Sequence, residues 1–119
     1  MPASFQYANI AHMQRLVVPC IVALLSFATT ARAQDDVSLA ETIFEAGRAY
    51  YEQGNYEKAL EQFEEAYRLD PQPEILYNIG QCHERLGQFE GAIEAYQAYI
   101  DESPGAEDLQ AVTEKIKMI

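Results

Sequence analysis

Cys82 and His83 are adjacent, and they are the only cysteine and the only histidine from Gln34 onward. A thiol and an imidazole within reach of each other can form a nucleophile–base pair or bind a metal ion. Neighbouring residues on a helix point about 100° apart, however, so these two side chains do not face a common ligand. We expect a buried, unreactive thiol at Cys82 and a histidine bonded between helices at His83. The alternatives are a reactive thiol and a metal ligand or pH switch.

Paired carboxylates, such as Glu64-Glu65 and Asp101-Glu102, are the other groups that could act in catalysis. Two carboxyl groups in different environments can supply a general acid and a general base, but glutamates repeated along helices usually form a solvated face. The sequence contains no Cys-x-x-Cys, His-Glu-x-x-His, glycine-rich phosphate loop or nucleophile-elbow motif. We therefore predict no catalytic residues, no cofactor and no metal site, and a protein that is not an enzyme.

The acidic residues are confined to one part of the chain. All 19 lie from Asp35 onward, and residues 34–119 contain only six basic residues, which gives this segment a net charge of −13. Nucleic acids and anionic membrane surfaces bind clustered Lys and Arg, so we expect neither as a partner. A basic or neutral protein partner fits this charge. The alternative is that the acidic residues only keep the protein soluble.

The segment 1–33 has the pattern of an export signal. Arg15 precedes the uncharged run Leu16–Ala31, and Ala31-Arg32-Ala33 has the small-x-small pattern of a cleavage site. The uncharged run is shorter than the stretch of about 20 apolar residues that a membrane-spanning helix needs. We expect cleavage after Ala33, export to the periplasm or cell envelope, or secretion, and no firm membrane association of the remaining chain. An uncleaved signal that anchors the protein is the alternative.

The stretch from Gly54 to Pro71 returns in similar form from Gly87 to Pro104. The two stretches read GNYEKALEQFEEAYRLDP and GQFEGAIEAYQAYIDESP. The correspondence continues outside them, because the same interval separates Ile43, Leu76 and Leu109, and again Ala46, Ile79 and Val112. The interval is 33 residues. A fixed period of this length indicates stacked copies of one supersecondary unit.

Each unit has the apolar spacing of helices. Ile43, Ala46, Gly47 and Tyr50 follow the i, i+3, i+4, i+7 pattern of one helical face. Four kinds of signal mark the helix ends: a capping-box pattern, glycines for left-handed C′ positions, an N-cap, and prolines that stop the second helices and suit the first turns of the following ones. In that order they are Ser38 with Glu41, Gly54 and Gly87, Asn55, and Pro71, Pro73 and Pro104. The spacing predicts helices near 39–53, 56–69, 74–86, 89–101 and 105–118, and no strand.

A helical hairpin repeated at this period resembles the tetratricopeptide repeat (TPR). The matching residues of unit one are Gly47, Ala49, Tyr50, Gly54, Tyr56, Ala59, Phe63, Ala66 and Pro71. Those of unit two are Leu76, Gly80, Gly87, Phe89, Ala92, Tyr96 and Pro104. The sequence departs from the family at His83 and Tyr99, where the family prefers an aromatic residue and alanine. The resemblance implies an all-α fold, an α-solenoid of antiparallel helix hairpins with about two and a half TPR units after the signal peptide.

The predicted organisation follows from these boundaries. It consists of a signal peptide at 1–33, a short acidic lead at 34–38, TPR unit one at 39–72, TPR unit two at 73–104, and a C-terminal capping helix or partial third unit at 105–119. In the last segment we expect Leu109, Val112, Ile116 and Ile119 to face inward. The residues expected to face water are Glu107, Asp108, Gln110, Glu114, Lys115 and Lys117.

In this family the first helix of each hairpin lines a concave surface that receives peptides or helices. Carried over by register, the predicted groove consists of Phe44, Arg48, Tyr51, Tyr77, Asn78, Gln81 and Glu84. Aromatic residues and one arginine within an acidic rim suit an amphipathic or extended peptide with basic flanks. The alternative is that Phe44 and Tyr51 only complete hairpin packing. Some family members hold a terminal carboxylate with Lys and Asn, but these faces carry no lysine, so we do not expect that mode.

These observations favour a non-catalytic, exported adaptor or scaffold that binds a protein or peptide partner in the groove. A rival of another class is a structural protein that self-associates as a homo-oligomer through the ends of the stack, or is held at the membrane by its signal. A third alternative is a truncated fragment of a larger TPR protein.

Overall fold

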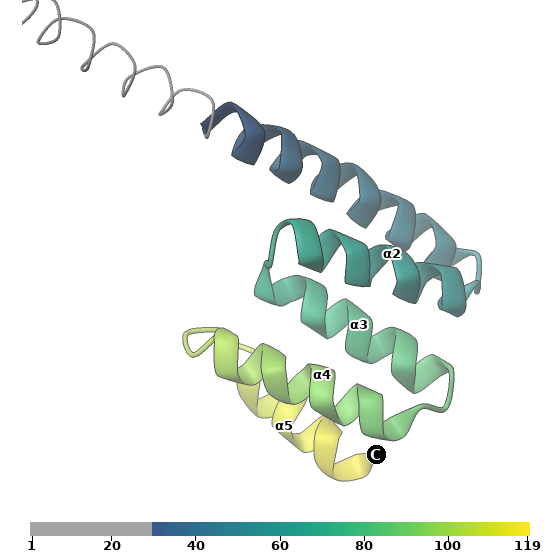
Figure 1. Cartoon of the computed structure of the whole chain (residues 1–119). Coiled ribbons are helices and arrows are strands. Elements are labelled where there is room, and N and C mark those ends of the chain that lie inside the picture. Colours follow the sequence, from purple (N-terminus) through teal and green to yellow (C-terminus); the bar gives the residue numbers. More distant parts are fainter. Residues whose placement is uncertain (1–29) are drawn as a thin grey trace, which may run out of the picture. The chain divides into compact units, whose positions relative to one another are not determined.

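The computed structural model describes residues 30–119, of which Asp36–Ile119 form one compact unit. The predicted signal peptide lies almost entirely outside the described residues. Residues 30–52 are helical, and the part inside the unit, residues 36–52, is called the leading helix below. Four helices follow (Figure 1): α2 (Tyr56–Leu69), α3 (Pro73–Arg85), α4 (Phe89–Glu102) and α5 (Leu109–Met118). Residues 30–119 contain no strand, so the all-α fold class is confirmed.

The same turn ends the leading helix and α3. Gly54 and Gly87 have φ values of 77° and 71°, in the left-handed region that favours glycine. The amide of the residue after each glycine donates to a carbonyl five residues earlier, from Asn55 to Tyr50 at 2.9 Å and from Gln88 to His83 at 2.8 Å. This is the Schellman arrangement, and both glycine predictions are confirmed.

Two further boundary predictions are confirmed. The Asn55 side chain accepts a hydrogen bond from the Lys58 amide at 3.3 Å and so caps α2. Pro73 is the first residue of α3, where its missing N–H leaves no helical hydrogen bond unmade.

The predicted start of the first helix at residue 39 is wrong. The chain is already helical at residue 30 and throughout the acidic lead at 34–38, because neither glycine nor proline interrupts residues 30–38. Ser38 is therefore inside the helix and does not cap it. Its carbonyl accepts a hydrogen bond from Oγ1 of Thr42 at 3.1 Å, one helical turn ahead. The Ser-x-x-Glu pattern is coincidental here.

The predicted start of the last helix at residue 105 is also wrong, since α5 begins at Leu109. Residues 103–108 form turns, and the Ala106 amide donates to the Ser103 carbonyl at 3.0 Å. Pro104 lies in this turn and not in a first helical turn. The hydroxyl of Tyr99 donates to the Asp108 carboxylate at 2.7 Å and fixes the residue from which α5 begins.

The sequence period is also a period of packing. A Cβ atom at Gly47 would lie 2.8 Å from the Phe63 ring, and one at Gly80 would lie 2.5 Å from the Tyr96 ring. The rings of Phe44 and Phe63 are 5.4 Å apart and tilted by 51°. The equivalent rings of the second hairpin, Tyr77 and Tyr96, are 5.4 Å apart and tilted by 49°. Each hairpin therefore closes on one aromatic ring, and glycine permits the close approach.

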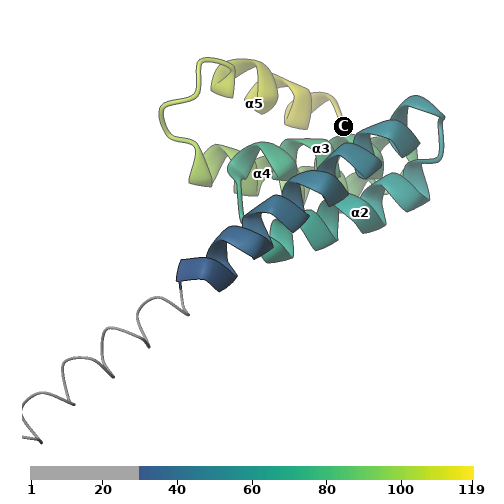
Figure 2. The same cartoon turned by 90° about the horizontal axis from the view of Figure 1, so that it is seen from above.

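The helices stack in chain order, with α2 against α3, α3 against α4 and α4 against α5 (Figures 1 and 2). One continuous core joins α2 to α5, and its largest fully buried side chains are Phe63, Tyr96 and Cys82. The stack is an α-solenoid of helix hairpins. Among residues 30–119, no helix combines the length and the apolar character that crossing a bilayer requires.

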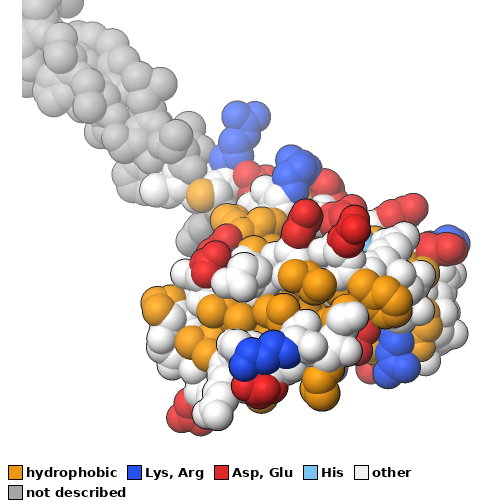
Figure 3. Space-filling model, turned by 90° about the horizontal axis from the view of Figure 1, so that it is seen from below, with side chains coloured by type: hydrophobic (Ala, Val, Ile, Leu, Met, Phe, Trp, Pro, Cys, Tyr) orange, Lys and Arg blue, Asp and Glu red, His pale blue; other side chains and the backbone are white. Residues whose placement is uncertain are grey.

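Hydrophobic side chains remain visible at the α4–α5 end of the stack. Figure 3 views the unit from this end and shows a hydrophobic band across its middle, with acidic side chains gathered along one edge. The elements at this end contribute partly buried apolar residues: Ala98, Ile100, Ala106, Leu109, Ile116 and Ile119. These residues pack against the buried core and leave part of their surface at the exterior.

Candidate functional site

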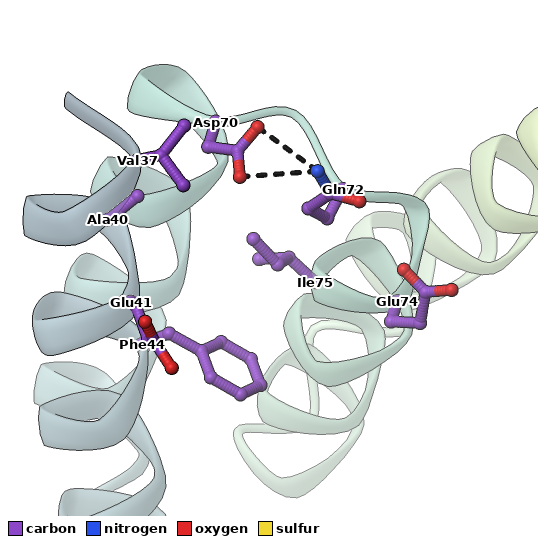
Figure 4. A pocket seen from close by; sticks show the side chains of 8 residues that line it. All are labelled: Val37, Ala40, Glu41, Phe44, Asp70, Gln72, Glu74 and Ile75. Carbon is purple, nitrogen blue, oxygen red and sulfur yellow. Dashed lines mark hydrogen bonds between the residues drawn. The ribbon is translucent and has the colours of Figure 1, made fainter. Parts of the chain in front are cut away.

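The hollow between the leading helix and the start of α3 is the first candidate site. It has a volume of about 280 Å³, and we call it the N-terminal hollow (Figure 4). Four of its residues lie on one face of the leading helix, at i, i+3, i+4 and i+7, and four come from the α2–α3 turn and the start of α3. They are Val37, Ala40, Glu41 and Phe44, with Asp70, Gln72, Glu74 and Ile75.

The wall of the N-terminal hollow is apolar. Ala40 and Ile75 are buried, with 3% and 6% of their surface exposed. Phe44 is half-buried, because its ring packs against the core residue Phe63, but it still faces the hollow. Val37 is 49% exposed at the margin. The hollow thus offers contact area to an apolar group that comes from solvent.

Three carboxylates lie around this apolar wall. Glu41, Asp70 and Glu74 line the hollow, and none of them makes an ion pair within residues 30–119. The Asp70 carboxylate accepts two hydrogen bonds from Nε2 of Gln72, at 3.1 and 3.2 Å, but that donor is neutral. The negative charge of the rim is therefore uncompensated.

A second hollow, of about 520 Å³, lies between α3 and α5, and we call it the C-terminal hollow. Its wall combines one aromatic ring, apolar side chains and three charged groups. The lining residues are Tyr77, Glu84, Asp108, Ala111, Val112, Lys115, Met118 and Ile119.

Glu84 joins three helices at the edge of the C-terminal hollow. Its carboxylate accepts a hydrogen bond from the Tyr96 hydroxyl at 2.8 Å and pairs with Nζ of Lys115 at 3.1 Å. Partial burial opposes ionisation of Glu84, but the contacts with Tyr96 and Lys115 outweigh it and lower the pKa of this carboxyl. Burial, followed by the bond to Glu84, raises the pKa of the Tyr96 hydroxyl.

The prediction that Lys115 faces water is wrong. Its ammonium lies 5.2 Å from the centre of the Tyr96 ring and 5.7 Å from that of Tyr77, within cation–π range. The leading helix and α3 carry no lysine, as expected, but α5 supplies Lys115 to the C-terminal hollow. Because Lys115 is already paired with Glu84, it is not an unpaired cation that awaits an anion.

The structure divides the predicted groove residues between these hollows. Phe44 lines the N-terminal hollow, whereas Tyr77 and Glu84 line the C-terminal one. The other four line neither. Arg48 is exposed and pairs with Glu45. Tyr51 packs on Tyr56 and accepts a hydrogen bond from Arg85. The Asn78 side chain donates to the Glu74 carbonyl, and Gln81 is half-buried on α3.

Cys82 and His83 have separate environments. The Cys82 side chain is fully buried, and burial raises the pKa of its thiol to about 12, assisted by the nearby charge of Glu64. Nδ1 of His83 lies 2.7 Å from Oε1 of Gln88, and a Cβ atom at Gly91 of α4 would lie 2.9 Å from the same nitrogen. The predicted burial of Cys82 is confirmed, and its lack of reactivity stays a prediction. His83 is bonded to Gln88, which directly precedes α4, and not to a residue within another helix. Within residues 30–119, no three His, Cys, Asp or Glu side chains are grouped to hold a metal ion.

Sequence reasoning missed most of the apolar wall of the N-terminal hollow. Val37 lies before the predicted helix start, although Val37, Ala40 and Phe44 continue the helical spacing upstream. Phe44 was predicted, and extending its apolar period toward the N-terminus would also have predicted Val37 and Ala40. Lys115 and Met118 of the C-terminal hollow had no such signal, because their placement depends on how α5 packs on α4.

A family model for the tetratricopeptide repeat matches residues 44–107. This range is more than half of the 119-residue chain and covers both repeated stretches. The protein therefore belongs to the tetratricopeptide repeat family. Repeats of this family commonly mediate protein–protein interaction and are generally non-catalytic, which agrees with an adaptor or scaffold role.

Proposed function

We propose that this protein is an exported, non-catalytic adaptor that holds a protein or peptide partner along its hollowed side. The observation that carries the proposal is the position of the two hollows. Both are lined by α3, together with the leading helix in one hollow and with α5 in the other, and both combine apolar surface with carboxylates. Such a surface suits an amphipathic or extended segment with basic flanks. A net charge of −13 over residues 34–119 favours the approach of a basic partner.

The partner is tested by crosslinking the cell-envelope fraction and capturing the protein. We expect one reproducible partner with the wild-type chain. Phe44→Ala and Tyr77→Ala each remove an aromatic ring from one hollow and should reduce recovery at least fivefold. Phe89→Ala is the matched control, because Phe89 is exposed and lines neither hollow. Circular dichroism of each variant checks that the helices persist. Equal recovery with all variants would contradict the proposal.

Export is tested separately by sequencing the N-terminus of the protein recovered from the envelope or medium. The proposal expects a chain that begins at Gln34. Recovery of the intact N-terminus in the membrane fraction would instead support the signal-anchored alternative.

Self-association is the second candidate function, and the hydrophobic band at the α4–α5 end favours it (Figure 3). Stacks of this kind generally gain stability from further repeats, which a second copy could supply. Sedimentation over a hundredfold concentration range separates the two functions. A concentration-independent monomer supports the adaptor, and a dimer that forms with increasing concentration supports self-association.

A further inference from the structure

The N-terminal hollow is closed on one side by the α2–α3 turn and open on the other. Figure 4 shows Val37 and Phe44 on the leading helix across the hollow from Ile75 of α3, with the bonded pair Asp70 and Gln72 in the connecting turn. Its volume of about 280 Å³ is below that of most small-molecule sites, which begin at about 300 Å³. The space therefore fits a single side chain of a partner better than a whole organic ligand.

The cations nearest in sequence do not neutralise the rim. Arg48 of the leading helix pairs with Glu45 at 3.3 Å. Arg68 of α2 makes a bidentate pair with the carboxylate of Glu65. Glu41, Asp70 and Glu74 have no ion pair among residues 30–119. Two kinds of surface thus meet at the hollow: an apolar wall and an unpaired acidic rim. A partner that inserts only an apolar residue leaves the rim charges unmatched, whereas one with an adjacent cation matches both.

We propose that the N-terminal hollow is an anchor site for one apolar side chain of a protein partner, and that the rim selects a Lys or Arg next to that anchor. The occupant is a segment with Leu, Ile, Met or Phe beside a basic residue. In an extended segment the cation lies within two positions of the anchor, and in a helical one it lies three or four positions away. The inference rests on the proposed function and deepens it, since it names where the partner is anchored and by what chemistry.

The test uses a phage-displayed library of random 12-residue peptides, selected on the purified full chain. The affinities of fluorescent copies of the enriched peptides are then measured for the wild type, for Tyr77→Ala in the C-terminal hollow, and for four further variants. Glu74→Lys reverses one rim charge, and Glu90→Lys is its control, because both residues are exposed glutamates in the first turn of a helix. Val37→Ser removes an apolar side chain from the wall of the N-terminal hollow. Leu39→Ser is its control, because both side chains are 49% exposed on the same helix.

We expect enriched peptides with an aliphatic or aromatic residue beside Lys or Arg. Glu74→Lys should weaken their binding at least tenfold and Val37→Ser at least fivefold, with both controls within twofold of wild type. Affinity should also fall as NaCl rises from about 50 to about 500 mM. Replacing the basic residue of the peptide with Gln should reproduce the effect of Glu74→Lys.

Three results would overturn the inference. Peptides that bind but lose affinity only with Tyr77→Ala would place the anchor in the C-terminal hollow and leave the proposed function intact. A change from dimer to monomer with Val37→Ser in sedimentation would make a second copy the occupant. Failure to select any peptide, together with no captured partner, would remove the proposed function as well.

Discussion

Gly80 lies against the ring of Tyr96, so that a Cβ atom at position 80 would be 2.5 Å from Cε1 of that ring. Tyr96 is fully buried and its hydroxyl is bonded to Glu84, so the ring cannot move aside. The α3–α4 hairpin therefore depends on the absence of a side chain at one position.

Gly80→Ala should destabilise the protein by about 1 to 3 kcal/mol, because overpacking outweighs the gain of about 1 kcal/mol in helix propensity. Urea unfolding followed by circular dichroism measures the change. Gly105→Ala is the control, since a Cβ atom there meets nothing within 4 Å. Equal stability of the two variants would show that the close contact does not limit the fold.

The Glu84 carboxylate should make stability depend on pH. Its folded pKa is lowered from 4.5, so its stabilising contribution is present above about pH 4.5 and is lost as the pH falls through the lower folded value. Glu84→Gln should lower the free energy of unfolding at pH 7 by up to about 1 kcal/mol, a modest figure because the pair is partly exposed. The difference from wild type should shrink in acid. Glu90→Gln, at an exposed position on α4, is the control for replacing a helical glutamate.

The Cys82 thiol should be unreactive in the folded protein. Because burial raises its pKa to about 12, almost no thiolate is present at pH 8. Reaction with a thiol reagent should therefore follow unfolding and accelerate sharply in denaturant. Above pH 9, where an unfolded thiol ionises, the raised folded pKa should also cost stability. Rapid labelling of the native protein would show that the side chain is accessible.

The contact between Tyr99 and Asp108 should set where α5 begins. The hydrogen bond to Asp108 raises the pKa of the Tyr99 hydroxyl to about 12, and it ties the turn before α5 to α4. Asp108→Ala should cost about 1 kcal/mol and increase amide exchange in residues 109–112. Glu107→Ala, at an exposed neighbouring position, should leave exchange unchanged.

Local signals predicted the parts of the fold that local chemistry decides. Asn55 caps α2 through its own side chain, and Gly54 and Gly87 adopt the conformations expected of them. A local signal failed at Ser38, because a capping pattern has no effect inside a helix that has already started. A second local signal failed at Pro104, since the start of α5 depends on Tyr99, which lies on a different helix.

The candidate site was predicted less completely than the fold. Register on the first helices found Phe44, Tyr77 and Glu84, which line the hollows. It missed contributions from turns and from α5, such as Asp70 and Lys115, because these depend on packing between helices that are distant in sequence. The period of the sequence indicates which helices line the hollows, and tertiary contacts decide what chemistry the hollows display.

Site-specific photocrosslinking in the cell envelope tests partner binding along the hollowed side most directly. A photoreactive residue is placed at Ala111, which is exposed on α5 and lines the C-terminal hollow, or at Glu61, which is exposed on the second helix of the first hairpin. We predict one reproducible crosslinked partner from position 111 and none from position 61, with the product lost when Tyr77→Ala is added. Equal crosslinking from both positions, or crosslinking from position 61 alone, would contradict the account.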